Sequence, residues 1–288
     1  MVKRILFILL SLNICSCRQI DIKGLFIPTS EGVQTRFEQS MEILDGLKAG
    51  TVDALDSYIF YVAADPHINQ THRNLDVFND ALRNDVDAAF GVILGDCTDI
   101  PDNFQRYLDA LSYSHEKHTA NQPIFHNLGN HDIYFDGWEN FKEFIGASVY
   151  WFEVVFQEGK DLYIALDTAT GTLGSKQTEW LKTFLDSYRK SYRNCVVLTH
   201  TNLFYTDNSQ AGSGNMPIEE TYSLIDLFGR HDVSLVLQGH DHYREELVFN
   251  DVMYTTVGAI SDNSNAPEYL ILSVNDDKIE HDWHLVLN

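Results

Sequence analysis

The chain has 288 residues, of which 44% are hydrophobic, 12% aromatic and 22% charged. These values are typical of a packed globular protein and exclude disordered, collagen-like, coiled-coil and multi-span membrane chains. Lys and Arg number 20 against 42 Asp and Glu, which gives a net charge of −22. Because a field of this sign repels polyanions, we expect no nucleic-acid binding, whereas a small anionic substrate is compatible with a site that carries its own cations.

The first 17 residues have the pattern of an export signal. A basic pair, Lys3-Arg4, precedes the apolar run 5–10, which Leu12 and Ile14 extend. The whole stretch is about half the ~20 residues that cross a bilayer. We therefore predict a signal peptide over 1–17 and export to the cell envelope, the periplasm or the medium. The Ile-Cys-Ser-Cys stretch that ends at Cys17 resembles a bacterial lipobox, with Cys17 as the lipidated residue. The alternative is a plain signal peptide with no lipid, so membrane contact is expected only through this anchor.

The body of the chain alternates predicted strands and helices. Six apolar, β-rich runs are predicted as strands: 58–63, 90–94, 123–128, 162–166, 195–199 and 233–237. Between them, four apolar stripes at three- and four-residue spacing predict amphipathic helices: Leu75 to Ala89, Phe104 to Leu111, Trp180 to Tyr188 and Tyr222 to Phe228. This alternation predicts an α/β fold whose sheet is covered on its faces.

The end of the chain has a different pattern from the middle. Four further strands are predicted with short turns between them: 246–249, 252–257, 268–274 and 278–286. We expect them to form a β meander. One domain over 58–288 is the simplest division, with 18–57 as an N-terminal extension.

Two cysteines lie in the predicted domain, Cys97 and Cys195. Cys97 follows one predicted strand, whereas Cys195 begins another. Parallel strands place these positions at opposite edges, too far apart for a disulfide, so we expect both to be free thiols.

Polar residues cluster where the predicted strands stop. In α/β sheets, ligands bind outside the carboxyl ends of the strands. Five such ends carry Asp65-Pro66-His67, Gly95-Asp96-Cys97-Thr98-Asp99, Gly129-Asn130-His131-Asp132, His200 and Gly239-His240-Asp241-His242. Imidazole, carboxylate and amide donors suit a pair of metal ions, which clamp the attacking and leaving oxygens of a displacement. Asp96 is the natural carboxylate to bridge the two.

Single blocks of this kind have ordinary explanations. A His at a strand end is often only hydrogen-bonded, and an Asp there is often a helix N-cap. Asp99 is assigned that capping role, because a helix is predicted from about residue 102. All five blocks in one order, each directly after an apolar run, favour a shared site.

The order of the blocks from Asp65 to His242 resembles that of the calcineurin-like metallophosphoesterases. The resemblance implies a four-layer α/β/β/α sandwich of two mixed sheets flanked by helices. It implies that Asp65, His67, Asp96 and His242 hold one metal, and that Asp96, Asn130, His200 and His240 hold the second. It also implies that His131 contacts the phosphate or protonates the leaving group, and that Asp132 orients His131.

The activity implied is hydrolysis of a small phosphoester, monoester or diester, by metal-activated hydroxide, with iron, manganese or zinc as the ions. Two alternatives are open. One is a non-catalytic metal- or partner-binding protein on the same fold, and the other is a mononuclear site that uses a subset of these residues.

Several neighbouring residues have weaker assignments. Arg73 and Arg244 are expected in surface ion pairs, although either is a candidate for binding phosphate. Tyr134, Phe135 and Trp138 are expected in the core rather than against a substrate. The Gly- and Ser-rich segment 207–217 is expected to be a loop at the mouth of the site, either a lid or a plain solvated loop.

Overall fold

The computed structural model describes residues 31–117, 122–204, 216–276 and 278–287. The expected signal peptide with Cys17, and most of the expected loop at 207–217, therefore lie outside the described residues. The α-helices are α1 (Val33–Ile43), α2 (Arg73–Asn84), α3 (Phe104–Lys117), α4 (Trp138–Phe144), α5 (Gly174–Tyr188) and α6 (Ile218–Arg230). None of these described helices combines the length and apolar character needed to cross a bilayer.

The strands form two sheets. They are β1 (Lys48–Asp53), β2 (Tyr58–Ala63), β3 (Ala88–Ile93), β4 (Ile124–His126), β5 (Tyr150–Phe156), β6 (Gly159–Ala165), β7 (Cys195–Leu198), β8 (Leu235–Gln238), β9 (Glu245–Phe249), β10 (Val252–Thr256), β11 (Glu268–Val274) and β12 (Ile279–Leu285). The seven-stranded sheet has the order β1-β5-β6-β7-β8-β10-β9, and the five-stranded sheet has the order β12-β11-β2-β3-β4. Both sheets are mixed, with parallel centres at β6-β7-β8-β10 and at β2-β3-β4.

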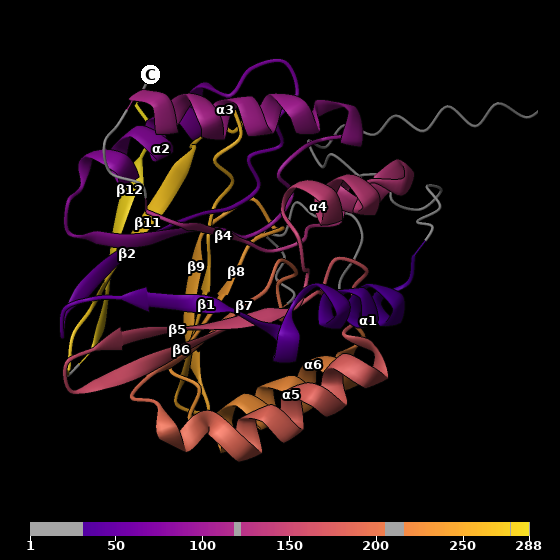
Figure 1. Ribbon diagram of the computed structural model, residues 1–288, viewed down its shortest axis with the longest axis vertical. Helices are drawn as coiled ribbons and strands as arrows, with labels where there is room; N and C mark the ends of the chain where they lie inside the picture. The colour runs from indigo at the N-terminus through magenta and orange to yellow at the C-terminus, as the bar shows by residue number, and fades with distance from the viewer. Residues whose placement is uncertain (1–30, 118–121, 205–215, 277, 288) are drawn as a thin grey trace, which may run out of the picture.

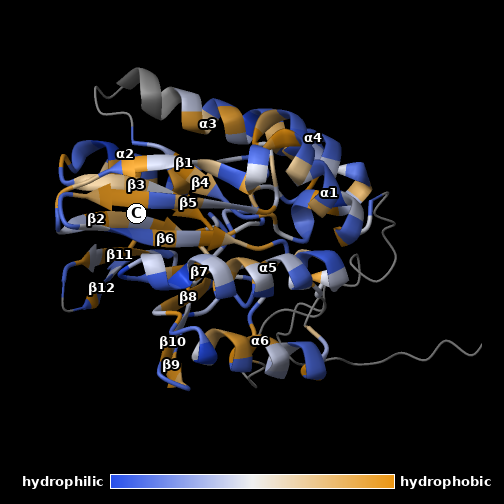
Figure 2. Cartoon of the chain, turned by 60° about the horizontal axis from the view of Figure 1, so that its bottom comes forward, coloured by the Kyte–Doolittle hydropathy of each residue, from blue (hydrophilic) through white to orange (hydrophobic). Residues whose placement is uncertain are grey.

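The two sheets pack face to face over an aromatic core. Phe60 and Phe90 of the smaller sheet stack with ring centroids 4.9 Å apart, and both meet the Tyr163 ring of the larger sheet edge-on. Helices α2, α3 and α4 cover the outer face of the five-stranded sheet, while α5 and α6 cover that of the seven-stranded sheet (Figures 1 and 2). This confirms the predicted four-layer α/β/β/α sandwich.

The predicted helices and strands are present, with two strands and two helices in addition. The four apolar stripes correspond to α2, α3, α5 and α6. The Leu75 stripe ends earlier than predicted, because Val86 lies past the helix and is exposed. Strands β1 and β5 and helices α1 and α4 were not predicted.

The prediction of a C-terminal β meander is wrong. Strands β9 and β10 form a hairpin in the seven-stranded sheet, where β10 also runs parallel to β8. Strands β11 and β12 form a second hairpin in the other sheet, where β11 pairs with β2. The connection from residue 257 to 267 therefore crosses from one sheet to the other, which local strand patterning cannot show.

Residues 31–57, the described part of the expected extension, are packed into the same body as the rest. Strand β1 pairs in parallel with β5 at one edge of the larger sheet. Helix α1 packs against α5 (Figure 1). The predicted boundary at residue 58 falls between two strands that share one core, to which both Val52 and Tyr58 belong.

Cys97 and Cys195 are free and buried, as predicted. Cys97 follows β3 of the five-stranded sheet, whereas Cys195 begins β7 of the seven-stranded sheet.

Candidate metal centre

Five strand ends bring the polar blocks to one place, as the sequence predicts. The blocks after β2, β3 and β4 come from neighbouring strands of one sheet, and those after β7 and β8 from neighbouring strands of the other. Hydrogen bonds join blocks across the sheets: the His240 N–H donates to the Asp65 carboxylate at 2.9 Å, and the Asn127 side chain donates to the Leu198 carbonyl at 2.9 Å.

Much of the backbone at the site lies in the left-handed region, which residues with a side chain seldom adopt. Positive φ values occur at Asp65 (53°), His67 (46°), Asp96 (51°), His240 (71°) and His242 (61°). Each such residue costs about 1–3 kcal/mol and persists only where the surroundings enforce it, most often at functional sites. Five of the seven expected metal ligands therefore share a strained conformation.

One glycine allows two of the blocks to meet. A Cβ atom on Gly129 would lie 2.1 Å from the Asp96 backbone nitrogen, so only glycine fits there. The close approach lets the His131 N–H donate to Asp96 Oδ1 at 2.8 Å.

The first cluster consists of Asp65, His67, Asp96 and His242. One donor atom of each lies within 4.8 Å of the others, the geometry of a metal-binding group. The His67 and His242 Nε2 atoms are 3.0 Å apart. His67 Nε2 is 3.5 Å from Asp96 Oδ2, and His242 Nε2 is 3.7 Å from Asp65 Oδ1.

The second cluster consists of Asp96, His200 and His240, with Asn130 beside them. His200 Nε2 is 3.4 Å from Asp96 Oδ1, 3.0 Å from Asn130 Oδ1 and 3.2 Å from His240 Nδ1. Asp96 thus turns Oδ2 toward the first cluster and Oδ1 toward the second. This is the position that the sequence analysis gives to a bridging carboxylate.

A hydrogen bond on the outer nitrogen of His200 and an ion-pair contact on that of His67 fix which atoms of these two histidines face inward. His200 Nδ1 donates to the Leu94 carbonyl at 2.8 Å, and His67 Nδ1 lies 3.1 Å from Asp99 Oδ1. The Nε2 atoms of both rings are left facing the clusters. Carboxylate or carbonyl partners on the far nitrogen are typical of metal-binding histidines.

Burial and mutual charge shift the ionisation of the two carboxylates in opposite directions. Burial, with the charge of Asp96, raises the pKa of Asp65 to about 7. For Asp96 burial acts in the same direction, but His200, His131 and His67 outweigh it and hold the pKa well below its usual value.

The pKa values of the histidines are also shifted in opposite directions. Burial lowers the pKa of His67 and of His200, but carboxylate neighbours outweigh it and raise the values to about 9 and about 10. For His242, burial and the neighbouring His67 lower the pKa to about 3. At neutral pH two protonated imidazoles therefore balance the carboxylates of the metal-free protein.

These residues fit a pair of metal cations. Asp65 and Asp96 are buried, and the ion pairs that the structure gives them are with histidines only. Buried carboxylates need a compensating charge, and bound cations would replace the two imidazole protons. The donor set of nitrogen and oxygen suits zinc, iron or manganese.

His131 lies beside the clusters and is only half-buried. Its ring meets the His67 ring edge-on with centroids 4.6 Å apart, and its Nδ1 is 3.2 Å from the Asp99 carbonyl oxygen. Asp132 is fully buried. Its carboxylate accepts the Gly129 N–H at 2.9 Å and the Thr98 N–H at 3.3 Å. Asp132 therefore joins the backbones of two ligand-bearing loops, and its expected role toward the His131 ring stays a prediction.

Two residues at the site were missed by the sequence analysis. The predicted capping role of Asp99 is wrong, because the following 3₁₀ turn, Pro101–Asn103, has Ile100 at its N-cap and no side-chain cap. The Asp99 carboxylate faces His67 instead. Tyr134 accepts a hydrogen bond from the Asn130 amide at 2.8 Å. The spacing Gly-Asp-x-x-Asp was the available signal for Asp99, whereas Tyr134 was expected only as a core residue.

The neighbouring residues mostly have the expected roles. Arg73 lies 3.7 Å from Asp262, and Arg244 lies 3.6 Å from Glu268, as surface ion pairs. Tyr134 and Trp138 are buried, whereas Phe135 is exposed, contrary to its expected place in the core.

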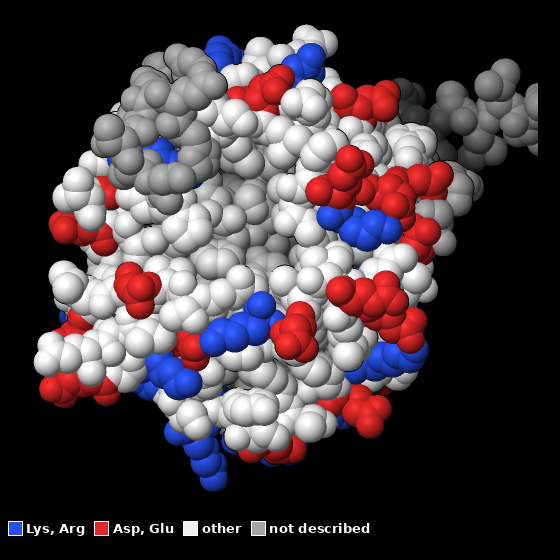
Figure 3. Space-filling model, viewed as in Figure 1, with Lys and Arg blue, Asp and Glu red and all other residues white. Residues whose placement is uncertain are grey.

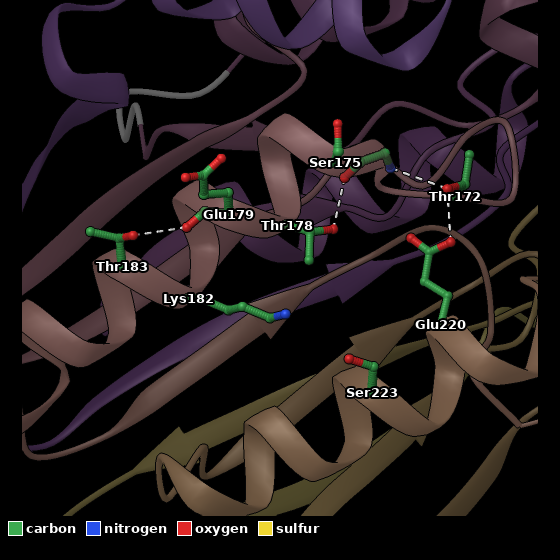
Figure 4. A pocket seen from close by; sticks show the side chains of 9 residues that line it. Thr172, Ser175, Thr178, Glu179, Lys182, Thr183, Glu220 and Ser223 are labelled. Atoms are coloured by element: carbon green, nitrogen blue, oxygen red, sulfur yellow. Dashed lines mark hydrogen bonds between the residues drawn. The ribbon is translucent and has the colours of Figure 1, made fainter.

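A cavity of about 690 Å³ lies elsewhere, between α5 and α6, and none of the expected ligands lines it. Its three threonine hydroxyls are already engaged: Thr178 donates to the Gly174 carbonyl, Thr183 to the Glu179 carbonyl and Thr172 to Glu220 (Figure 4). The chemistry therefore points to the strand ends and not to this cavity.

Comparison with protein families gives one match, the calcineurin-like phosphoesterase family, over residues 59–244. No curated protein sequence matches the chain. The fold is similar to that of a dimetal phosphatase from Danio rerio, with a TM-score of 0.59 at 14% identity over 78% of this chain and 95% of the other.

Two further solved structures are similar. For a purple acid phosphatase from yellow lupin the TM-score is 0.61 at 14% identity, over 80% of this chain and 51% of that one. For a Plasmodium protein described as the anchor in the inner membrane complex, the TM-score is 0.58 at 15% identity, over 79% of this chain and 84% of that one. At these identities the similarity shows the fold.

Proposed function

Because the chain belongs to the calcineurin-like phosphoesterase family, we propose that it hydrolyses small phosphoesters with two metal ions at the strand ends. The observation that carries this proposal is the pair of clusters that share Asp96, one oxygen toward each. Asp65, His67, Asp96 and His242 would hold one ion, and Asp96, Asn130, His200 and His240 the other. When bound, such a pair polarises phosphoryl oxygens and lowers the pKa of water toward neutrality.

The protein's own groups prepare the site for this reaction. Strand ends and left-handed turns hold the ligands before any ion arrives, which reduces the reorganisation that binding requires. Tyr134 receives the amide hydrogen of Asn130, so the carbonyl oxygen of that amide faces the second cluster.

His131 is proposed as the proton donor to the leaving group. A carbonyl oxygen only accepts, so the His131 Nδ1 carries the hydrogen that faces the Asp99 carbonyl. Nε2 is then the nitrogen that gives or takes a proton, and a positioned histidine contributes about 10²–10⁴-fold to such steps.

The substrate is proposed to be a small monoester or diester. On the face shown in Figure 3, basic side chains are scattered among acidic ones, and the described residues of this face form no continuous basic stripe. Together with the net charge of −22, this disfavours a long polyanion and favours a ligand small enough to contact the ions themselves.

We also propose that the chain is exported and attached to the cell envelope through Cys17. The support is the basic pair, the apolar run and the lipobox-like sequence. Incorporation of labelled palmitate that is lost in Cys17→Ser would support the anchor, and equal labelling of both chains would contradict it.

The experiment that tests the activity pairs metal content with turnover. The chain without residues 1–17 is assayed on aryl phosphomonoesters and phosphodiesters with added manganese, beside Asp96→Asn and the control His231→Ala, a histidine outside the blocks. We expect the wild-type chain to bind nearly two ions. Turnover should fall by about 10³-fold or more in Asp96→Asn and should stay unchanged in His231→Ala.

A chain that binds no ion and hydrolyses neither ester with any supplied metal would overturn the proposal. That result would favour the alternative of a non-catalytic binding protein. The Plasmodium anchor protein shows that the fold also occurs in a protein described by a role other than hydrolysis.

A further inference from the structure

Helix α1 lies before the part of the chain that matches the family, residues 59–244, yet it contacts residues that neighbour two of the blocks in the second cluster. It packs along α5 (Figure 1). One of its faces is polar and buried, with Arg36 and Ser40 at 0% exposure. Buried polar groups on a surface helix need specific partners. Ser40 meets Ser148, whereas the partner of Arg36 leads to the candidate metal centre.

The first contact is a buried ion pair between Arg36 and Asp167. The Arg36 Nε and Nη2 atoms donate to the two oxygens of Asp167 at 2.7 and 2.9 Å. Both side chains are fully buried. Asp167 lies just past the end of β6, at the same edge of the sheet as the metal-binding blocks. A two-pronged pair of this kind fixes orientation as well as distance.

The residue after Asp167 is hydrogen-bonded to the backbone of His200, a candidate metal ligand. The next residue, Thr168, accepts hydrogen bonds at its Oγ1 from the backbone N–H of His200 at 3.1 Å and of Thr201 at 3.0 Å. The Thr201 hydroxyl donates back to the Thr168 carbonyl at 2.7 Å. The backbone of His200 is thus tied to residue 168, which is held by its neighbour's pairing with α1.

A second contact runs from α1 to the opposite side of the cluster. The Trp138 indole N–H donates to Gln39 Oε1 at 2.5 Å. Trp138 begins α4, directly after the 3₁₀ segment His131–Asp136 that follows Asn130. A Cβ atom on Gly137 would lie 2.3 Å from the Asp132 carbonyl. The turn before Trp138 is therefore tightly packed, and a shift of Trp138 would displace its neighbours.

We propose that helix α1 is a positioning element for the second metal-binding cluster, acting on His200 through Arg36, Asp167 and Thr168 and on the Asn130 block through Gln39 and Trp138. This inference rests on the proposed function. Asp96 is shared by both clusters, but Asp65, His67 and His242 of the first cluster do not take part in these two chains of contacts, so the first ion serves as the internal reference. Loss of these contacts weakens the binding of the second ion selectively.

The test is a calorimetric titration of the metal-free chain with Mn²⁺ and Zn²⁺, done below the unfolding temperature of each variant. His240→Ala and His242→Ala identify which binding step belongs to which cluster. The test variants are Arg36→Gln, Arg36→Lys as partial rescue, and Thr168→Val, which keeps the side-chain volume but removes the Oγ1 acceptor. The matched control is Lys176→Ala, which removes an exposed ion pair between α5 and Glu38 of α1.

We expect the second ion to bind about 10-fold to 100-fold more weakly in Arg36→Gln and Thr168→Val, as is usual when a partner of a ligand is lost. Arg36→Lys should show an intermediate loss, and the first ion and the Lys176→Ala chain should not change. If Arg36→Gln does not fold, Arg36→Lys, the second variant on α1, decides.

Two results would overturn the inference. In one, the wild-type chain binds two ions and the variants bind both with unchanged affinity. In the other, both ions weaken equally in the test variants, which would show general loosening of the fold. A wild-type chain that binds no ion would instead overturn the proposed function, and this inference with it.

Discussion

Buried carboxylates near the two ends of the parallel strands have two different kinds of partner. At the starting end, Asp161 of β6 is fully buried and receives hydrogen bonds from Arg193 at 2.7 and 3.1 Å, Tyr58 at 2.8 Å and the Asn194 N–H at 2.9 Å. At the carboxyl end, Asp65 and Asp96 are equally buried, but the cationic partners given for them are histidines.

The difference separates a structural charge from a charge kept for a ligand. Arginine is a permanent partner, because it does not lose its proton in proteins. A histidine proton is exchangeable for a metal ion, since the neutral ring is itself a ligand. Asp161, like Asp167 in its pair with Arg36, is thus held by a permanent ion pair, whereas Asp65 and Asp96 are left to be completed by cations.

The largest expected effect concerns His131, which belongs to the carboxyl end but not to the metal-binding set. His131→Ala should lower kcat by about 10²–10⁴-fold while the metal content stays unchanged. Steady-state kinetics with metal analysis measures both. Full activity in His131→Ala would show that the ions act without this proton donor, and loss of both ions would show that it is a ligand.

Neutralising Asp161 and Asp65 in separate variants tests the distinction between these two carboxylates. Asp161→Asn should destabilise the protein by about 3–5 kcal/mol, because Arg193 is left without its buried partner. Asp65→Asn should stabilise the metal-free protein by about 1 kcal/mol at pH 8. The pKa of Asp65 is raised to about 7 in the fold, so its ionised form costs stability at any higher pH.

Urea unfolding of both variants in the presence of a chelator measures these changes. Equal destabilisation by the two substitutions would contradict the distinction between the two carboxylates.

Substitution of Asp99, which contacts the His67 ring, should have a smaller effect on metal binding or activity. Asp99→Ala should weaken metal binding or activity by about 10-fold to 100-fold, because the His67 ring loses the carboxylate 3.1 Å from its Nδ1. Asp102→Ala, on the neighbouring 3₁₀ turn, is the control. Equal titration curves for Asp99→Ala and the wild type would remove Asp99 from the site.

The pH dependence of metal binding gives the finest test. In the metal-free protein the pKa values of His67 and His200 are raised to about 9 and about 10. Both rings are therefore protonated at pH 7, and ion binding must displace these protons. Affinity should rise from pH 7 toward pH 9, by about tenfold per unit for each proton displaced. Calorimetry in buffers of different ionisation enthalpy counts the protons, and an affinity independent of pH would contradict the proposed ionisation.

The site was more predictable from the sequence than parts of the fold. Each block follows an apolar strand, so the parallel strands of each sheet bring the blocks of that sheet to one edge. The pairing of strands depends on contacts distant in sequence, and no local pattern showed that the connection after β10 crosses to the other sheet. Strand β1 is mostly polar, with burial at Val52 alone, and so lacks the apolar run that marks a strand.

Asp99 and Arg36 show why the remaining site residues were missed. An Asp two residues before a Pro fits a helix start, and only the fold reveals His67 beside it. Arg36 lies 131 residues from its partner Asp167. A charged residue on a helix is usually solvated, so no sequence rule distinguishes this one.

The most direct test of the central claim is a diffraction measurement on crystals of the full chain grown with Mn²⁺, with anomalous maps calculated above and below the metal edge. We expect two peaks, one on each side of the Asp96 carboxylate, about 3.5–4 Å apart. One peak, or none, with Asp96 contacting only the surrounding histidines, would contradict a shared two-metal centre.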